Sequence, residues 1–269
     1  TKNYGRVGLD FGGAVNDSGS VLYRFVATGH LADGMQQGTK LKGYALAPSI
    51  TFNPDDNNSL TLYSRFQYDP DLGVITSLPA YGTVFTNPNG KLPRDAYPGE
   101  PNHNTFSRKQ STVGYSYIHN FSEDWSTVLK GRYFGETSNY DAVIMSGLND
   151  DMRTISRNTA VSDEHYNTLN FDNQIHGFFD TGALSHELLT GVGVDHMRGH
   201  TDYGSGSVSS LDIYHPDYGV AEFGPTALWQ DSRVSSTQTG VYLQDQIAWQ
   251  QWRTTVGIRH RSEERRVGK

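Results

Sequence analysis

The chain has 269 residues, enough for one large domain or two ordinary ones, and it contains no cysteine, which excludes disulfides and thiolate metal sites. Only 35% of the residues are hydrophobic, which is thin for a soluble core, and the net charge of −7 argues against a nucleic-acid partner. No run of 18 apolar residues occurs, so a transmembrane helix is excluded. A membrane β-barrel is not excluded, because its strands carry only alternating hydrophobicity.

Apolar and polar residues alternate in about ten segments, which predicts β-strands with one apolar face. The pattern begins at residues 6–15, where Val7, Leu9 and Phe11 alternate with polar residues and glycines. It is as clear at its far end, where Val241 and Leu243 alternate with polar positions. Each segment has about the length that a tilted strand needs to cross a bilayer. The clear segments, in chain order, are 6–15, 43–52, 59–69, 111–121, 168–179, 187–196, 236–249 and 254–260.

The connections between these segments alternate between short and long. The tight ones are residues 16–19, 53–58, 122–124, 181–184 and 250–251, and the longer ones are 30–40, 70–107, 138–165 and 199–233. All long connections therefore leave the same end of the sheet. A soluble Greek-key sandwich has no reason to keep this order, whereas an outer-membrane barrel has short periplasmic turns and long extracellular loops. We therefore predict an all-β, antiparallel, up-and-down transmembrane barrel with lipid against its apolar face.

The alternation stops near the end of the sequence. Residues 254–260 still have the strand pattern, but residues 261–269, RSEERRVGK, are mostly charged. Charge runs are usually solvated. We predict that residues 1–260 form part of a barrel and that residues 261–269 are a tail outside it, resembling foreign sequence appended to a truncated gene.

Several strings resemble the barrel of TonB-dependent ferric-siderophore receptors, with the ferrichrome, or hydroxamate, branch the most similar. They include YALAPSITFNPDDNNSLTL (44–62), LPAYGTVFTNPNG (78–90) and TGVYLQDQ (239–246), and the resemblance covers residues 4–260. It implies a 22-stranded barrel, of which this chain would supply about ten strands, without the N-terminal plug or its TonB box. It also implies an outer-membrane receptor that takes up a ferric siderophore, driven by the TonB complex.

The resemblance also indicates where a ligand would bind. The iron of a ferric hydroxamate is wrapped by its own oxygens, so the protein needs aromatic faces and a few hydrogen-bonding groups rather than metal ligands or a cofactor. Where the resemblance places ligand-contacting aromatic residues, this chain has Ile75, Ser77, Ile144 and Ser146, which favours a siderophore other than ferrichrome. The candidates are the aromatic residues of the long connections: Tyr81, Phe85, Tyr97, Tyr140, Tyr203, Tyr214, Tyr218, Phe223 and Trp229.

Two other classes of function remain open at this point. A passive porin-like channel would have the same strand pattern, and a secreted β-sandwich could use loop aromatics to bind glycans. A metal site is not expected, because His196 and His200 lie four residues apart without a third converging ligand. No nucleophile elbow or phosphate loop occurs, so we do not expect an enzyme.

Overall fold

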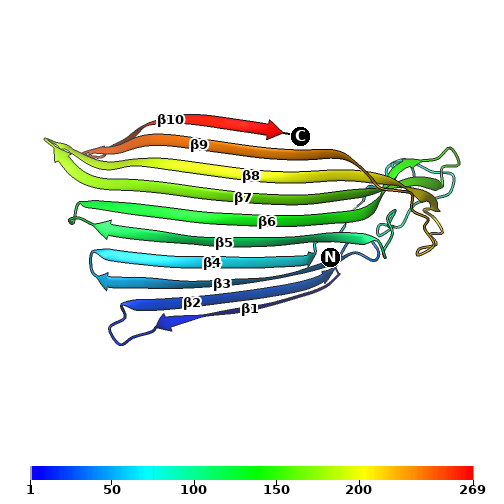
Figure 1. Cartoon of the computed structure of the whole chain (residues 1–269), viewed down its shortest axis with the longest axis horizontal. Coiled ribbons are helices and arrows are strands. Elements are labelled where there is room, and N and C mark those ends of the chain that lie inside the picture. The colour runs from blue at the N-terminus through cyan, green and yellow to red at the C-terminus, as the bar shows by residue number, and fades with distance from the viewer. Residues whose placement is uncertain (1, 75, 269) are drawn as a thin grey trace.

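The computed structural model describes residues 2–74 and 76–268, and within them the regular structure is entirely β-strand. The ten strands form one antiparallel sheet in chain order (Figure 1). Among the described residues, no helix is long and apolar enough to cross a membrane. The strands are β1 (Lys2–Ala14), β2 (Val21–Asp33), β3 (Lys40–Asp55), β4 (Asn58–Asp71), β5 (Asn104–Asn120), β6 (Trp125–Leu148), β7 (Thr154–Thr181), β8 (Leu184–Asp212), β9 (Ala227–Trp249) and β10 (Trp252–Gly268).

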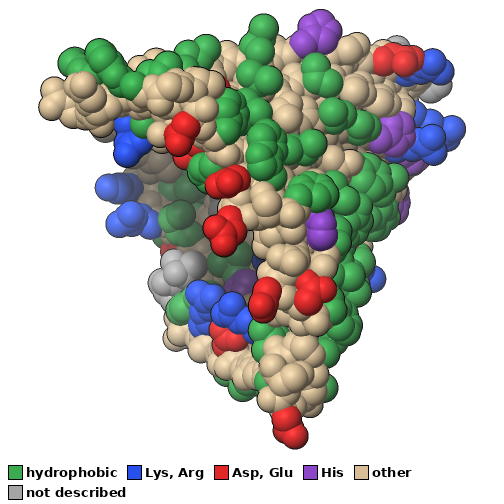
Figure 2. All heavy atoms as spheres, turned by 90° about the vertical axis from the view of Figure 1, so that its left-hand side faces the viewer, with side chains coloured by type: hydrophobic (Ala, Val, Ile, Leu, Met, Phe, Trp, Pro, Cys, Tyr) green, Lys and Arg blue, Asp and Glu red, His purple; other side chains and the backbone are tan. Residues whose placement is uncertain are grey.

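Each strand pairs with the strands before and after it, which is the predicted up-and-down topology. The sheet curves around a hollow, with hydrophobic side chains on its outer side (Figure 2). A β-sandwich would need a second sheet facing the first, and the described residues contain a single sheet. The described part of the chain therefore forms a single curved sheet rather than a sandwich.

The apolar face of the sheet is covered by nothing in the described structure. Val241 and Leu243, in the middle of β9, keep 49% and 44% of their surface exposed, and Leu9 and Ile258 on the two edge strands are exposed as well. The buried cluster of Leu92, Ile155, Leu211 and Ile213 instead joins the long connections to the strand ends beside them. An apolar surface of this extent would be an aggregation hazard in water and is the expected outer surface in lipid.

The concave face is polar and carries a group of arginines. Arg6, Arg24, Arg65 and Arg132 line a trough of about 710 Å³. Arg24 donates from Nε and Nη2 to the carboxylate of Asp10 at 2.9 and 2.6 Å. Side chains of this kind need water or polar partners. The two faces therefore match the predicted arrangement of lipid outside and a hydrated lumen inside.

Aromatic side chains lie over glycines on the neighbouring strand at several positions. A Cβ on these glycines would meet the aromatic ring of the directly opposite residue. Such pairing fills the gap that a strand glycine leaves and helps to fix the register. The pairs, all in direct register, are Tyr63 with Gly114, Tyr115 with Gly131, Trp125 with Gly177, Tyr166 with Gly199 and Tyr242 with Gly191.

We expect Gly191→Ala to destabilise the barrel by about 1–3 kcal/mol, the usual range for overpacking. The new Cβ would lie 2.5 Å from Cζ of Tyr242 and 2.9 Å from the backbone oxygen of Asn173, which cannot move without disturbing the ladder. Gly193→Ala is the matched control on the same face of β8, because its nearest neighbour would be the backbone oxygen of Phe171 at 3.8 Å. Denaturant unfolding of the full-length receptor in detergent measures both, and equal losses would contradict the pairing.

The tight turns lie where the sequence predicts them, but two of the predicted long loops are largely strand. Residues 138–165 contain the paired ends of β6 and β7, joined by residues 149–153 alone. Residues 199–233 similarly contain the ends of β8 and β9, which leaves residues 213–226 as the connection. The ladder continues because it still satisfies backbone hydrogen bonds beyond the lipid, where both faces are wet and alternation is not required.

The end of the chain also differs from the expectation. Strand β10 continues through Gly268, with Arg261 opposite Gly240 and Gly268 opposite Arg233, so residues 261–268 extend the sheet. Oppositely charged residues two apart neutralise one another along the strand, as in Glu264 and Arg266 at 2.6 Å. Residue 269 lies outside the described part of the chain. The foreign origin of residues 261–269 stays a prediction, which sequencing of the parent gene would test.

Candidate ligand-binding wall

The described part of the loop of residues 72–103, which leaves out residue 75, folds over the ends of β6, β7 and β8, on the side where the long connections gather (Figure 1). A buried ion pair fastens it there: Nη1 of Arg157 in β7 lies 3.5 Å from Oε2 of Glu100, and both side chains are at most 2% exposed. Oε1 of Glu100 accepts the backbone N–H of Gly219 at 2.7 Å, and Arg157 Nη1 also donates to the Gly99 carbonyl at 3.2 Å. The Glu100 side chain thus joins its own loop to β7 through Arg157 and to the connection of residues 213–226 through Gly219.

Two candidate aromatic residues belong to this packing. Tyr97 is fully buried, and its burial raises the pKa of its hydroxyl. The hydroxyl of Tyr218 donates to the Tyr97 carbonyl at 2.7 Å. In the described arrangement Tyr97 is therefore out of reach of a ligand, because its side chain has no exposed surface. The sequence could not indicate this, since only the folded loop brings these segments together.

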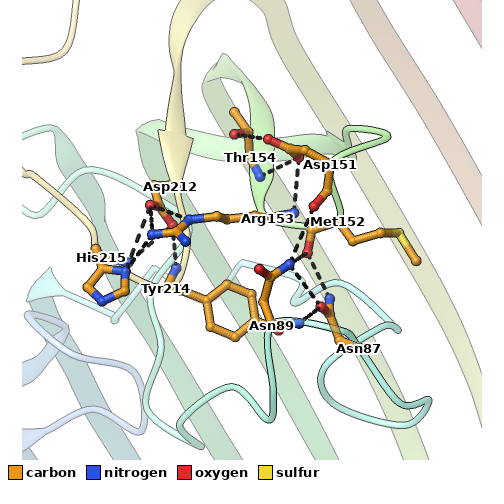
Figure 3. Close-up of polar contacts among 9 residues, drawn as sticks. All are labelled: Asn87, Asn89, Asp151, Met152, Arg153, Thr154, Asp212, Tyr214 and His215. Atoms are coloured by element: carbon orange, nitrogen blue, oxygen red, sulfur yellow. Dashed lines mark hydrogen bonds and ion pairs between the residues drawn. The ribbon is translucent and has the colours of Figure 1, made fainter.

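A second set of contacts holds the loop tips together (Figure 3). Asn87 donates to the Met152 carbonyl at 2.8 Å, and the hydroxyl of Tyr214 donates to the Gly90 carbonyl at 2.8 Å. Arg153 donates to the Asp212 carboxylate at 2.7 Å and to Nδ1 of His215 at 2.7 Å. Tyr214 also packs against the buried loop cluster, so this candidate has a structural role in the described arrangement.

The candidates at the outer surface of the loops form separate pairs. Tyr81 and Phe85 pack with ring centroids 5.6 Å apart and remain 45% and 59% exposed. Phe223 packs on the ring of His103, with centroids 4.7 Å apart. Of the positions where the resemblance implied aromatic ligand contacts, Ile75 lies outside the described residues, Ile144 is half-buried, and Ser77 and Ser146 are exposed. Because their rings are partly exposed, Tyr81 and Phe85 remain accessible at the outer surface of the loops.

The remaining candidates meet on the polar, concave face. Directly opposed residues share a face of the sheet, and the register places one row of side chains across five strands. The row contains Phe106 (β5), Tyr140 (β6), Ser162 (β7), Tyr203 (β8) and Gln230 (β9). We call this row, together with Trp229 beside it, the aromatic wall. It unites three of the predicted ligand residues, Tyr140, Tyr203 and Trp229.

A bulge accounts for the place of Trp229. The register shifts between Tyr203 and Gly204, where Gln230 and then Leu228 are the partners on β9, so Trp229 is the extra residue. Bulges of this kind re-aim a side chain. The Trp229 ring stacks on Tyr203 with centroids 5.6 Å apart and an interplanar angle of 16°. At the other end of the wall, Tyr140 packs edge-on against Phe106 at 5.4 Å.

The row next to the aromatic wall is polar. Sequence reasoning missed one of its members, Glu164, which lies opposite Thr201 and Ser138. Its Oε1 accepts the hydroxyls of Ser162 and Tyr203, both at 3.0 Å. The hydrogen bond to this carboxylate raises the pKa of Tyr203. The sequence does contain a signal for it: Glu164 is six residues before Asn170, and alternate residues of a strand share a face, so both lie on the polar face.

On the opposite, convex face, the fold brings together three side chains that the sequence did not link. Nε2 of His200 lies 2.9 Å from Oδ1 of Asp231 and 3.3 Å from Oδ1 of Asp202. These three groups could hold a metal ion by type and spacing. They also satisfy one another as charge-assisted hydrogen bonds, and the absence of a metal site stays a prediction.

Comparisons with known proteins place the chain. Residues 5–268 match the family model "TonB dependent receptor-like, beta-barrel". The ferrioxamine B receptor of Salmonella typhimurium (strain SL1344) is 32% identical over 253 residues, which cover 94% of this chain and 36% of that receptor. The ferrichrome outer membrane transporter/phage receptor of Escherichia coli (strain K12) is 32% identical over 284 residues, covering 95% and 37%.

Solved structures agree in fold. The ferric-catecholate import receptor Fiu from E. coli K12, in its open form, superposes with a TM-score of 0.79 at 20% identity, covering 98% of this chain and 43% of that one. The ferric preacinetobactin receptor BauA from Acinetobacter baumannii gives 0.81 at 13% identity, covering 98% and 40%. The chain spans just over a third of the length of the curated relatives it matches. It belongs to the TonB-dependent receptor β-barrel family, whose place is the bacterial outer membrane.

Proposed function

We propose that the chain is part of a receptor that imports a ferric siderophore of the hydroxamate type, with energy from the TonB complex. The observation that carries the proposal is the 32% identity, along more than nine-tenths of the chain, to receptors named for ferrioxamine B and ferrichrome. The geometry supports it, because an aromatic wall with a few polar anchors suits a compact ligand.

In this proposal the aromatic wall binds the complex from the side. Tyr203, Trp229 and the exposed part of Tyr140 offer ring faces, and the hydroxyl of Ser162 offers a polar contact between them. Tyr81 and Phe85 make the first contact at the outer surface. The iron keeps its own hydroxamate oxygens, so no protein side chain ligates it, no cofactor takes part and no bond is broken. The plug domain that would couple to TonB belongs to other parts of the receptor.

Uptake of radiolabelled iron by cells tests the proposal. The full-length receptor is expressed in a strain without other siderophore receptors and supplied with ferric hydroxamates or catecholates, with and without TonB. We expect TonB-dependent uptake of at least one ferric hydroxamate. TonB-independent entry of many small solutes would contradict the proposal and favour the porin-like channel.

A further inference from the structure

The carboxylate of Glu164 is incompletely paired. Both of its hydrogen-bond donors, Ser162 and Tyr203, bind the same oxygen, Oε1, and among the described residues Oε2 has neither a hydrogen bond nor an ion pair. Several other carboxylates in this part of the sheet have partners: Asp69 has Arg108 at 3.4 Å, Asp141 has His103 at 2.7 Å, and Asp163 has His165 at 2.9 Å. Glu136, on the same face as Glu164, accepts a hydrogen bond from Gln110 on Oε2. Glu164 thus brings to the aromatic wall a negative charge that no described cation neutralises, with Oε2 left without a described partner.

An aromatic surface lies beside this carboxylate. Tyr203 links the two directly, since its hydroxyl bonds to Glu164 while its ring stacks on Trp229. Trp229 is 65% exposed although its ring is one of the largest apolar groups of the wall. A carboxylate next to the faces of Tyr and Trp is the arrangement that attracts an organic cation, through charge on one side and the ring quadrupole on the other.

The position fits a ligand rather than lipid. Tyr203 and Glu164 share the polar, concave face with Asn170 by alternation along β7 and its register with β8. Leu169 is a residue of the apolar face in β7. Val161, at the height of the aromatic wall, lies eight residues further toward the long connections, which is about 26 Å along the strand. The group therefore faces the hollow of the sheet at the end where the long connections gather. Interfacial anchoring in lipid would require the opposite face.

We propose that Glu164, Tyr203 and Trp229 form a subsite for a cationic, ammonium-bearing arm of the ferric siderophore. The inference rests on the proposed function and adds a substrate class to it. The ammonium would approach Oε2 of Glu164 and lie against the exposed ring of Trp229, while the iron centre contacts the rest of the aromatic wall. The subsite would then select ferric hydroxamates with a free amine over otherwise identical neutral ones.

The test compares two ligands that differ in one charge. Ferrioxamine B ends in a primary amine that is protonated at neutral pH, and acetylation of that amine removes the charge without changing the iron centre. Their dissociation constants are measured on the purified full-length receptor by titration calorimetry. We expect Glu164→Gln to weaken binding of ferrioxamine B about tenfold, on the scale of a hydrogen bond to a charged group, and to leave the acetylated complex within about twofold.

Asp163→Asn is the matched control, because Asp163 precedes Glu164 in β7 and its carboxylate lies on the convex face beside His165. It should change neither constant. Trp229→Leu should reduce the preference for the charged complex, whereas Trp229→Phe should retain part of it. The wild-type preference should also fall as salt rises, because salt screens the ionic contact.

Two outcomes separate the inference from the proposed function. If the wild type binds both complexes and Glu164→Gln weakens both equally or neither, the cationic subsite is wrong and the siderophore receptor remains. If the wild type binds neither these complexes nor other ferric hydroxamates, the proposed function is wrong, and the cationic subsite is then wrong as well.

Discussion

Replacing Arg157 with Met will release the loop of residues 72–103 from the strand ends beneath it. Arg157 and Glu100 are almost completely buried, and Met has a similar volume without the charge. The substitution leaves the Glu100 carboxylate buried, with the Gly219 N–H as its remaining described donor. Removing one partner of a buried pair costs about 3–5 kcal/mol. We expect much faster amide hydrogen exchange in residues 72–103 and in the connection of residues 213–226.

The control for this prediction is an exposed ion pair. Asp10 and Arg24 form a close pair at 2.6 Å, but their side chains are 51% and 65% exposed, and such pairs contribute little. Asp10→Asn should leave exchange in both connections unchanged. If Arg157→Met also left it unchanged, the loop would be held by the contacts at its tips, such as Asn87 with Met152, rather than by the ion pair.

Placing arginine on the convex face at Leu243 will destabilise the barrel by about 2–4 kcal/mol, the cost of a basic side chain near the middle of a bilayer. Leu243 is six residues from Trp249 at the tight-turn end, about 20 Å along a strand or about 14 Å of height at a 45° tilt. That is close to half of the apolar thickness. Leu243 is 44% exposed, and the acidic side chain two residues away on the same face, Asp245, is already paired with Nδ1 of His186 at 2.7 Å.

Gln244→Arg is the matched control, because its side chain projects from the polar face one residue further along β9. It should fold almost as well as the wild type, with water around the new guanidinium. Refolding yield into lipid vesicles and the band shift of unheated samples on gels measure both variants. Equal tolerance of the two substitutions would mean that neither face of β9 meets lipid.

The sequence predicted the strands well, because lipid on one side and water on the other force a period of two on every spanning segment. The same reasoning predicted the tight turns, where little chain is available between paired strands. It was wrong about residues 138–165 and 199–233, because strand ends beyond the lipid keep their ladder without keeping the alternation. The loss of a pattern therefore marked the edge of the membrane rather than the end of a strand.

The candidate site could be predicted only in part. Composition selected Tyr203 and Trp229, but their stacking depends on a bulge in β9, which no local signal near Trp229 announces. Tyr97 has the same residue type and loop context, yet it lies buried beside a long-range ion pair. Glu164 was overlooked because a single carboxylate within a mostly polar stretch has no motif, and its importance comes from neighbours on two strands.

The most direct test of the account is the environment of consecutive residues in β9. Single cysteines are introduced at positions 241, 242, 243 and 244 of the full-length receptor, which is convenient because this part of the chain contains no cysteine. Nitroxide labels are attached, and their collisions with oxygen and with a water-soluble nickel complex are measured in lipid bilayers. The account predicts oxygen contact at 241 and 243 and greater nickel contact at 242 and 244. Equal access of the nickel complex to all four positions would contradict it.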